Sequence, residues 1–345
     1  MAKSIQQILS EHNDRLDAIV DEFQDRLQIM VEEAVAKLQK EYAEQLRLSA
    51  DSRVLQTAKN VRLLSSMDER FREHLNNAGY QKLLENYTRS FDGQFTHFGN
   101  IIDFINDNLV RPLPEVNFGT TDLAEFEAAK ITAGETLKET INKVASNAKQ
   151  QALLGVGAMD VDELGKIIQQ RMGRGVMESA NLAETAVSSY YRMVTDRGFQ
   201  IIEEDLPSFK IRYTYEGPLD KLNRPFCLKV EQQARNGKTW TRTQINQMDN
   251  KQLPNVFVTG GGYRCRHQWI IAVKDLAEQQ TSKPDDPKPA RRKKDKQDLQ
   301  KELRVKRTST KRATALVQRP SLDGLRTAAA SARKVLAEKR KANGQ

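Results

Sequence analysis

The chain has 345 residues, of which 38% are hydrophobic, 6% aromatic and 29% charged. This balance is too polar for one large core and too apolar for a wholly disordered chain, and the length predicts two or three domains. No apolar run approaches the roughly 18 residues of a membrane span, and the charged, amphipathic start predicts no secretory signal. Two cysteines exclude a disulfide scaffold.

Positive charge is concentrated toward the C-terminal end. The net charge is +9, but residues 282–345 hold 20 basic and 7 acidic side chains, a net of +13, and the rest carries −4. The sequence therefore predicts a mildly acidic body and a strongly basic tail, which favours a polyanion or an acidic protein surface as its neighbour. A merely solvated, disordered end is the alternative interpretation.

Residues 1–48 have the pattern of a long helix, with apolar side chains every three or four positions and charged ones between them. Two sets spaced by seven residues suit coiled-coil packing, namely Leu16, Phe23 and Met30, and Val20, Leu27 and Ala34. A helix cannot bury such a stripe against itself. We expect it to pack on another helix of the chain or on a neighbouring subunit, which would make a homo-oligomer through the N-terminal helices.

The pattern stays helical up to residue 198. Residues 51–77 predict a second helix, and the aromatic cluster in residues 80–110 is typical of a core helix pair rather than of a stacking surface. Residues 122–198 are again helical, with an interruption at residues 155–157 and a turn or hinge expected at residues 173–175.

Beyond residue 198 the pattern changes. Residues 209–215 alternate as a strand should, residues 241–245 have the pattern of a short capped helix, and residues 269–273 predict a second strand. We therefore predict a mainly α protein with a small α+β module. Its expected parts are an elongated helical region (1–198), the α+β module (199–278), and a basic linker with a helical or disordered tail (279–345).

Both cysteines lie in the predicted module, together with one of the four histidines. Cys265 and His267 are two residues apart, so on an extended strand their side chains point to the same side. Cys227 would supply a third soft ligand, and Asp220 or a water molecule could complete a tetrahedron around Zn²⁺. The sequence predicts no other cofactor. Two further interpretations stay open: a Cys227–Cys265 thiol pair or disulfide, and a Cys/His nucleophile.

Three consecutive glycines, Gly260, Gly261 and Gly262, precede the Cys-x-His element. A phosphate-binding loop is disfavoured, because no Lys-Ser/Thr pair follows and a strand rather than a helix comes next. We expect the glycines to provide positive φ and close backbone approach.

Two ordered motif elements in residues 215–269 resemble those of the minor head proteins of tailed phages, the Mu F-like or head morphogenesis family. The first is Asp220…Arg224-Pro225-Phe226-Cys227, and the second is Gly260-Gly261-Gly262-Tyr263-Arg264-Cys265-Arg266-His267. In that family an Asp-x-x-x-Arg-Pro element precedes a Gly-rich Tyr/Asn-Cys-Arg-Cys/His element, usually after a long helical region. The resemblance implies a virion component that acts in head assembly and associates with the portal and other head proteins. It implies no catalytic residue.

The expected location is the phage head, with the host cytoplasm as the site of assembly. The basic tail suits packaged double-stranded DNA, because polybasic segments bind duplex phosphates without reading sequence, and its lack of aromatic residues argues against single-strand stacking. The expected phosphate contacts are Arg291, Arg292, Lys293, Lys294, Lys306, Arg307, Lys311, Arg312, Lys339, Arg340 and Lys341.

Two rival functions remain. The first is a small metal-dependent nuclease or transferase built on Cys227, Cys265 and His267, although carboxylates for acid–base work are few nearby. The second is a DNA-binding or chromatin protein that depends on the tail alone, which leaves the motif in residues 215–269 unexplained. We therefore expect a non-enzymatic head protein.

Overall fold

The computed structural model describes residues 3–45, 57–155, 161–218, 220–221 and 223–282. The described residues belong to one compact unit, Met1–Ser282. Residues 283–345, and with them all the predicted DNA contacts, lie outside the described residues. The fold is mainly helical with one small two-stranded sheet, as predicted.

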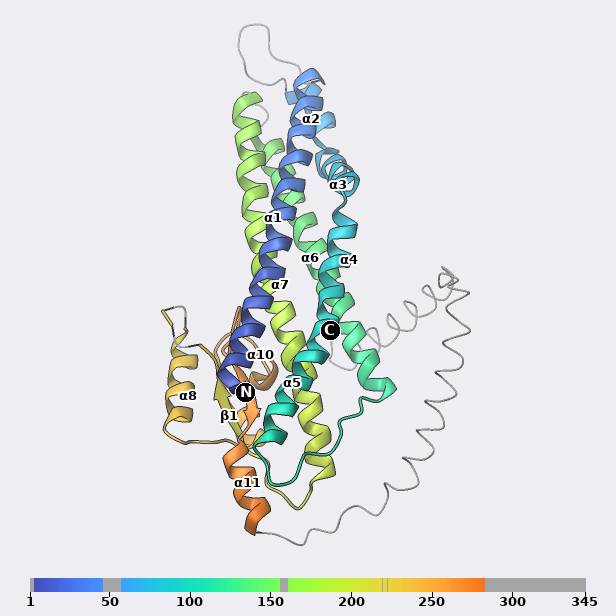
Figure 1. Cartoon of the computed structure of the whole chain (residues 1–345). Helices are drawn as coiled ribbons and strands as arrows, with labels where there is room; N and C mark the ends of the chain where they lie inside the picture. Colours follow the sequence, from blue (N-terminus) through green and yellow to red (C-terminus); the bar gives the residue numbers. More distant parts are fainter. Residues whose placement is uncertain (1–2, 46–56, 156–160, 219, 222, 283–345) are drawn as a thin grey trace, which may run out of the picture. The chain divides into compact units, whose positions relative to one another are not determined.

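Seven α-helices form the body of this unit: α1 (Ile5–Gln45), α2 (Thr57–Leu64), α3 (Met67–Asn77), α4 (Tyr80–Arg89), α5 (Gly93–Asp107), α6 (Thr120–Gly155) and α7 (Val161–Asp205). A 3₁₀ turn, η1 (Ser90–Asp92), joins α4 to α5. Figure 1 shows the long helices α1, α6 and α7 side by side, and α7 contacts both of the others.

The apolar stripe of α1 is buried within the chain, against α7, α3, α4 and α5. Leu27, Ala34 and Leu38 are fully buried, as are the matching faces of α6 and α7. This intramolecular bundle is one of the two alternatives that the sequence left open, and it leaves the stripe no free face for a second subunit. The aromatic cluster of α4 and α5 also lies in the core, as predicted.

Two expectations for α7 are wrong. Residues 173–175 form neither a turn nor a hinge, because α7 continues through them, and the helix ends at Asp205 rather than near residue 198. Gly175 serves close helix packing instead: a Cβ atom there would lie 2.7 Å from Val144 of α6. The predicted boundary between residues 198 and 199 therefore falls inside a continuous helix.

The module follows α7 and contains β1 (Tyr213–Glu216), α8 (Pro225–Arg235), α9 (Arg242–Asn246), α10 (Val256–Thr259), β2 (Gln268–Ile271) and α11 (Val273–Ser282). The strands pair antiparallel, with Tyr215 opposite Trp269. Both strands were predicted, but each is shorter than expected. The capped helix is confirmed, because the Thr241 side chain accepts from the backbone of Gln244 in a capping box.

The module packs directly on the body. The helix α7 contacts both α10 and β2, and the aromatic side chains of Phe199, Tyr213 and Phe257 continue the core from one region into the other. Among the described residues, no helix is long and apolar enough to cross a membrane, in agreement with the sequence.

Candidate metal centre

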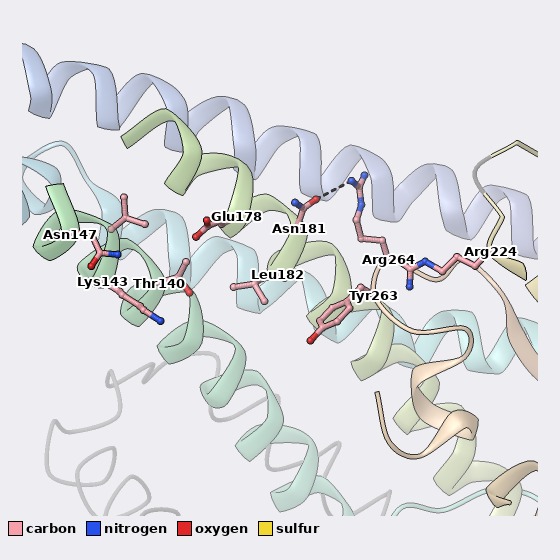
Figure 2. A pocket seen from close by; sticks show the side chains of 10 residues that line it. Thr140, Lys143, Asn147, Glu178, Asn181, Leu182, Arg224, Tyr263 and Arg264 are labelled. Carbon is pink, nitrogen blue, oxygen red and sulfur yellow. Dashed lines mark hydrogen bonds between the residues drawn. The ribbon is translucent and has the colours of Figure 1, made fainter. Parts of the chain in front are cut away.

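The predicted motif residues divide into an outer and an inner group. Arg224, Tyr263 and Arg264 belong to the outer group and line a groove of about 680 Å³ between the module and helices α6 and α7 (Figure 2). Lys143 of α6 lines the same groove. The guanidinium of Arg264 pairs with Glu184 of α7, and the Tyr263 side chain is 46% exposed. The groove therefore presents several cations and one exposed aromatic ring.

The inner group is a buried cluster of two sulfurs and an imidazole. Cys227 lies in the first half of α8, whereas Cys265 and His267 lie just before β2. Their potential ligand atoms all lie within 4.8 Å of one another, and all three side chains are buried. The structure thus brings together the three residues that the sequence selected, from two elements more than 30 positions apart.

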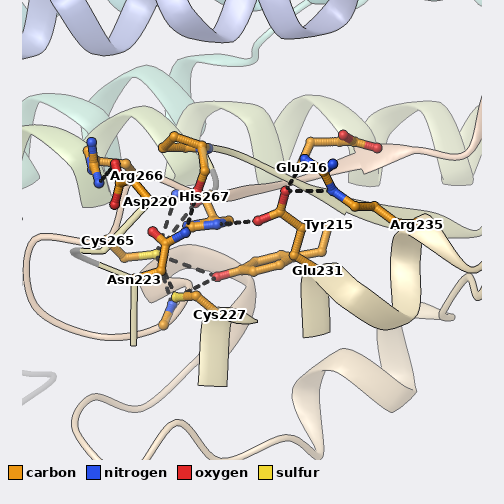
Figure 3. Close-up of polar contacts among 12 residues, drawn as sticks. Tyr215, Glu216, Asp220, Asn223, Cys227, Glu231, Arg235, Cys265, Arg266 and His267 are labelled. Atoms are coloured by element: carbon orange, nitrogen blue, oxygen red, sulfur yellow. Dashed lines mark hydrogen bonds and ion pairs between the residues drawn. The ribbon is translucent and has the colours of Figure 1, made fainter. Parts of the chain in front are cut away.

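The sulfur atoms share one set of hydrogen-bonding groups (Figure 3). The two Sγ atoms are 3.8 Å apart and both cysteines are free, so of the alternatives left open by the sequence the disulfide is not formed, whereas the two thiols do lie together. The Cys265 sulfur accepts from the backbone N–H of Gly261 at 3.1 Å and of His267 at 3.4 Å. The Tyr215 hydroxyl lies 3.5 Å from the Cys265 sulfur and 3.7 Å from the Cys227 sulfur. These donors suit a sulfur that carries negative charge.

The glycine run is explained by this cluster. A Cβ atom at Gly261 would lie 2.2 Å from the Cys227 sulfur, and one at Gly260 would lie 2.8 Å from the Cys265 sulfur. Gly260 and Gly262 have φ values of 57° and 105°, as expected for glycines that allow unusual backbone. Gly217 acts in the same way on the other side, because its Cβ atom would lie 2.5 Å from the His267 ring.

The imidazole of His267 is held by a carboxylate. Its Nε2 atom lies 2.7 Å from Glu231 of α8, and both side chains are only 2% exposed. The other carboxylate oxygen of Glu231 accepts from Arg235 at 3.0 Å. The Tyr215 ring stacks on the imidazole with a centroid distance of 5.1 Å. These contacts fix the ring and leave Nδ1 as the nitrogen that faces the sulfurs.

Charge in the cluster is concentrated on one sulfur. The hydrogen bond with Cys227 lowers the pKa of Cys265 well below its usual range, against the effect of burial, and the His267 imidazole lowers it further. The same hydrogen bond, together with burial, raises the pKa of Cys227. Burial opposes the charged imidazole, but hydrogen bonds to Cys265 and Glu231 outweigh burial and raise the pKa of His267. Both shifts favour negative charge on the Cys265 sulfur and positive charge on the imidazole.

Asp220, the predicted fourth ligand, lies outside this cluster. Its carboxylate accepts from Arg266 at 2.5 Å. Pro225 occupies the first turn of α8, where its missing N–H costs no hydrogen bond, so its role in the motif is to start the helix that carries Cys227. The guanidinium of Arg224 donates to Gln252 and, at 3.4 Å, to the carbonyl oxygen of Gly261.

A cavity of about 210 Å³ leads to the cluster. All three potential ligands, Cys227, Cys265 and His267, line it. Three arginines, Arg224, Arg264 and Arg266, make most of the remaining wall and give it a cationic character. Asn223 and Glu184 complete the wall. Because Arg224 and Arg264 also line the larger groove, the cavity lies beside that groove.

Sequence reasoning missed the residue that anchors the motif to the body. Arg192 of α7 is 3% exposed, and its guanidinium donates to the carbonyl oxygens of Val258, Cys265 and His267 at 2.5 to 3.2 Å. It fixes the backbone on both sides of the Cys-x-His element. No sequence signal marks it, because a single arginine in an otherwise regular helix is ordinary.

A second buried polar cluster was also missed. The rings of His12 and His97 stack at 3.8 Å, with Tyr191 against both, where α1 and α5 meet α7. Burial, together with the positive charge of Arg15, lowers the pKa of His97 to about 3. Burial also lowers the pKa of His12 well below its ordinary value, and the neighbouring His97 adds to this effect. Both rings are therefore neutral near pH 7.

Comparison of the chain with known protein families, with curated proteins and with solved structures finds no match. The functional interpretation therefore depends on the residues and their geometry. The inner cluster offers two kinds of chemistry. Two cysteine sulfurs and an imidazole can bind a thiophilic divalent cation, with loss of the thiol protons on binding, and a cysteine sulfur next to a carboxylate-oriented imidazole has the arrangement of an activated nucleophile.

Proposed function

We propose that this chain is a minor head protein of a tailed phage that acts in head morphogenesis, associates with the portal and is packaged in the virion. The observation that carries this proposal is the convergence of two motif elements. Residues 224–227 and 260–267 contribute to one buried cluster, although residues 228–259 separate them in the sequence. The module that holds them follows a long helical region, which is the order of parts in the family that the sequence resembles.

The body has the features of a component that holds its shape within an assembly. Its helices α1, α6 and α7 are each more than 35 residues long and are packed along their lengths. Because the stripe of α1 is buried inside the chain, contacts with a portal or another head protein would use other faces. Exposed apolar side chains on the outer face of α6 include Leu123 and Ile131, which are 49% and 43% exposed.

The proposal assigns the basic tail to the packaged DNA. Residues 283–345 follow the end of α11 at Ser282, and the net charge of the C-terminal segment is +13. Each lysine or arginine that neutralises a phosphate releases counterions, so binding is sequence-independent and falls steeply with salt.

Particle composition tests the head assignment. Proheads and mature heads are purified from the producing strain, and their proteins are identified by mass spectrometry. We expect peptides of this chain in the particles at low copy number, and we expect a tagged copy expressed in the same cells to co-purify the portal protein. Absence of the chain from both kinds of particle would overturn the proposal. A matched strain that lacks the gene controls for contaminating host proteins.

Deletion of the tail tests the DNA assignment. The full chain should bind any duplex, and its affinity should fall by about 10³-fold or more between 50 and 200 mM salt if six or more phosphates are neutralised. A chain that ends at Ser282 should lose this binding and keep its helical circular dichroism. Replacement of Arg291, Arg292, Lys293 and Lys294 by glutamine should flatten the salt dependence. Undiminished binding by the truncated chain would contradict the assignment.

A further inference from the structure

The cluster of Cys227, Cys265 and His267 has the dimensions of a tetrahedral metal site. In a Zn²⁺ site with Zn–S bonds of about 2.3 Å, two sulfur ligands of a regular tetrahedron lie about 3.8 Å apart. The two Sγ atoms are 3.8 Å apart. Two thiols in ordinary contact also reach this separation, so the assignment depends on the third group, an imidazole nitrogen within 4.8 Å of both sulfurs.

Neighbouring groups hold the sulfur and imidazole ligands in position. Gly261 donates its backbone N–H to the Cys265 sulfur at 3.1 Å, which helps to carry the charge of a metal-bound thiolate. Glu231 accepts from Nε2 of His267 at 2.7 Å, which is the carboxylate–histidine arrangement that orients metal-binding imidazoles. Glycine at positions 217, 260 and 261 keeps side chains out of the volume around these atoms.

One coordination position remains after these three ligands. Asp220 does not supply the fourth, because its carboxylate is bonded to Arg266. All three ligand residues line the cavity of about 210 Å³, so the cavity reaches the centre. Its wall contains Arg224, whose guanidinium donates to the amide oxygen of Gln252 and to the carbonyl oxygen of Gly261. An oxygen of a water molecule or of a small anion can therefore approach the ion from this side.

We infer that Cys227, Cys265 and His267 bind one Zn²⁺ ion through two sulfurs and Nδ1, with the fourth position open to the arginine-lined cavity. Glu231 is the positioning residue for the imidazole. The ligand at the open position is water or a phosphate- or carboxylate-type anion that Arg224 contacts. This site is independent of the proposed role in phage heads, since either can be true without the other.

Cobalt substitution tests the site with the full chain. The reduced, metal-free protein is titrated with Co²⁺, and absorbance is followed in the near ultraviolet, where thiolate-to-cobalt charge transfer appears, and in the visible, where tetrahedral Co²⁺ absorbs. We expect saturation at one ion per chain and displacement of Co²⁺ by Zn²⁺. Cys227→Ser and Cys265→Ser should lose the charge-transfer band or most of its intensity, with circular dichroism as the check on folding. Parent-like titration of both serine variants would overturn the site.

Two further variants keep the proposal testable if the serine variants fold poorly. Glu231→Gln retains all three ligands and should weaken Co²⁺ binding by about 10–100-fold, because the imidazole loses its carboxylate partner. Asp220→Asn is the matched control at a nearby carboxylate and should bind Co²⁺ as the parent does. Weakening by Asp220→Asn with none by Glu231→Gln would replace the assigned ligand set with one that includes Asp220.

The open position is tested with inorganic phosphate at saturating Co²⁺. Phosphate should shift the visible bands of the parent, and Arg224→Gln should raise the phosphate concentration required about tenfold or more, as expected for loss of a charge-assisted hydrogen bond. A parent spectrum that phosphate leaves unchanged would show a closed site. If instead the metal-loaded chain reacts with N-ethylmaleimide as fast as the metal-free chain, the thiols are not ligands and the nucleophile interpretation replaces this one.

Discussion

The helical body and the module bury their interiors in different ways. The body, α1 to α7, buries apolar stripes that extend along helices of up to 45 residues. The module has two strands of four residues each and buries Glu231 and His267, while Arg192 of α7 is buried against it. Apolar burial is additive and spread over many side chains, whereas each buried polar group depends on a specific partner. Loss of one of these polar partners should therefore damage the module more than loss of one apolar side chain damages the body.

The two regions can be followed separately in one experiment. Both tryptophans, Trp240 and Trp269, are buried in the module, so their fluorescence reports its unfolding. Far-ultraviolet circular dichroism is dominated by the long helices of the body. Urea unfolding monitored by both signals therefore shows whether a variant affects one region or both. We expect the two transitions of the parent to coincide, because the module packs on α7.

Arg192→Leu should have the largest effect. It leaves three buried carbonyl oxygens of the Cys-x-His region without their donor, and we expect a loss of about 4 kcal/mol in the stability of the module. The fluorescence transition should move to lower urea and separate from the circular dichroism transition. Arg197→Leu is the control on the same helix. Its side chain is 30% exposed, so about 1 kcal/mol is expected. Equal effects of the two variants would contradict the anchoring role of Arg192.

Leu27→Ala should come next. Leu27 is fully buried on α1, and removal of its side chain should cost about 3 kcal/mol through lost burial and an unfilled cavity. Because α1 supports α7 and α7 supports the module, both spectroscopic transitions should shift together. Ile29→Ala, at a site that is 56% exposed, should change stability by less than about 0.5 kcal/mol. A shift confined to circular dichroism would mean that the module is stable without the body.

The buried His12–His97 pair should make stability depend on pH. The pKa of His97 is about 3 in the folded chain, against about 6.5 when unfolded, so below pH 6.5 only the unfolded chain takes up this proton. Its contribution to stability is complete above pH 6.5 and is lost as pH falls toward 3. At pH 5 the loss is about 2 kcal/mol. His97→Gln should lack this part of the pH dependence and should differ from the parent by a constant amount above pH 7.

Two glycines of α7 should give the smallest and most sharply opposed effects. A Cβ atom at Gly173 meets nothing within 4 Å, so Gly173→Ala should stabilise the helix by about 0.5–1 kcal/mol. A Cβ atom at Gly175 would lie 2.7 Å from Val144, so Gly175→Ala should destabilise the body by about 1 kcal/mol or more. Urea midpoints from circular dichroism measure both. Stabilisation by both variants would show that α6 and α7 do not depend on this close approach.

The accuracy of sequence reasoning differed between the two regions for a physical reason. Helical periodicity is a local signal, and it placed α1, α6 and most of α7 correctly. It failed at residues 173–175, which resemble a turn but lie inside the helix. Gly175 is explained by Val144, a neighbour that the sequence does not reveal, whereas no contact explains Gly173. Helical periodicity also ended α7 seven residues early, at Gly198, where a Cβ atom would lie 2.2 Å from the Phe98 ring. At Gly175 and Gly198 a contact between helices, and not a local turn, selects glycine.

In the candidate site, the sequence selected the chemistry but not its arrangement. The two cysteines and His267 were identified from residue type and spacing, whereas Glu231 was not among the residues selected for the site. Its contact with His267 depends on how α8 packs beside β1, which no local pattern encodes. Asp220 was selected by proximity in sequence, yet Arg266 holds its carboxylate. Residue type shows which side chains can bind a metal, whereas the positions of their ligand atoms depend on how the helices and strands pack.

The amino-acid sequence by itself determined that this protein is mainly helical, that its net positive charge is confined to the C-terminal end, and that its cysteines and one histidine belong to a glycine-rich motif. These properties follow from composition and from short-range periodicity. Only the tertiary structure decided that the stripe of α1 is buried within the chain, that Arg192 fixes the motif to α7, and that the two sulfurs stand 3.8 Å apart beside a carboxylate-bound imidazole. Each of these features depends on contacts between residues far apart in the chain. Such contacts are determined by how whole helices and strands pack together.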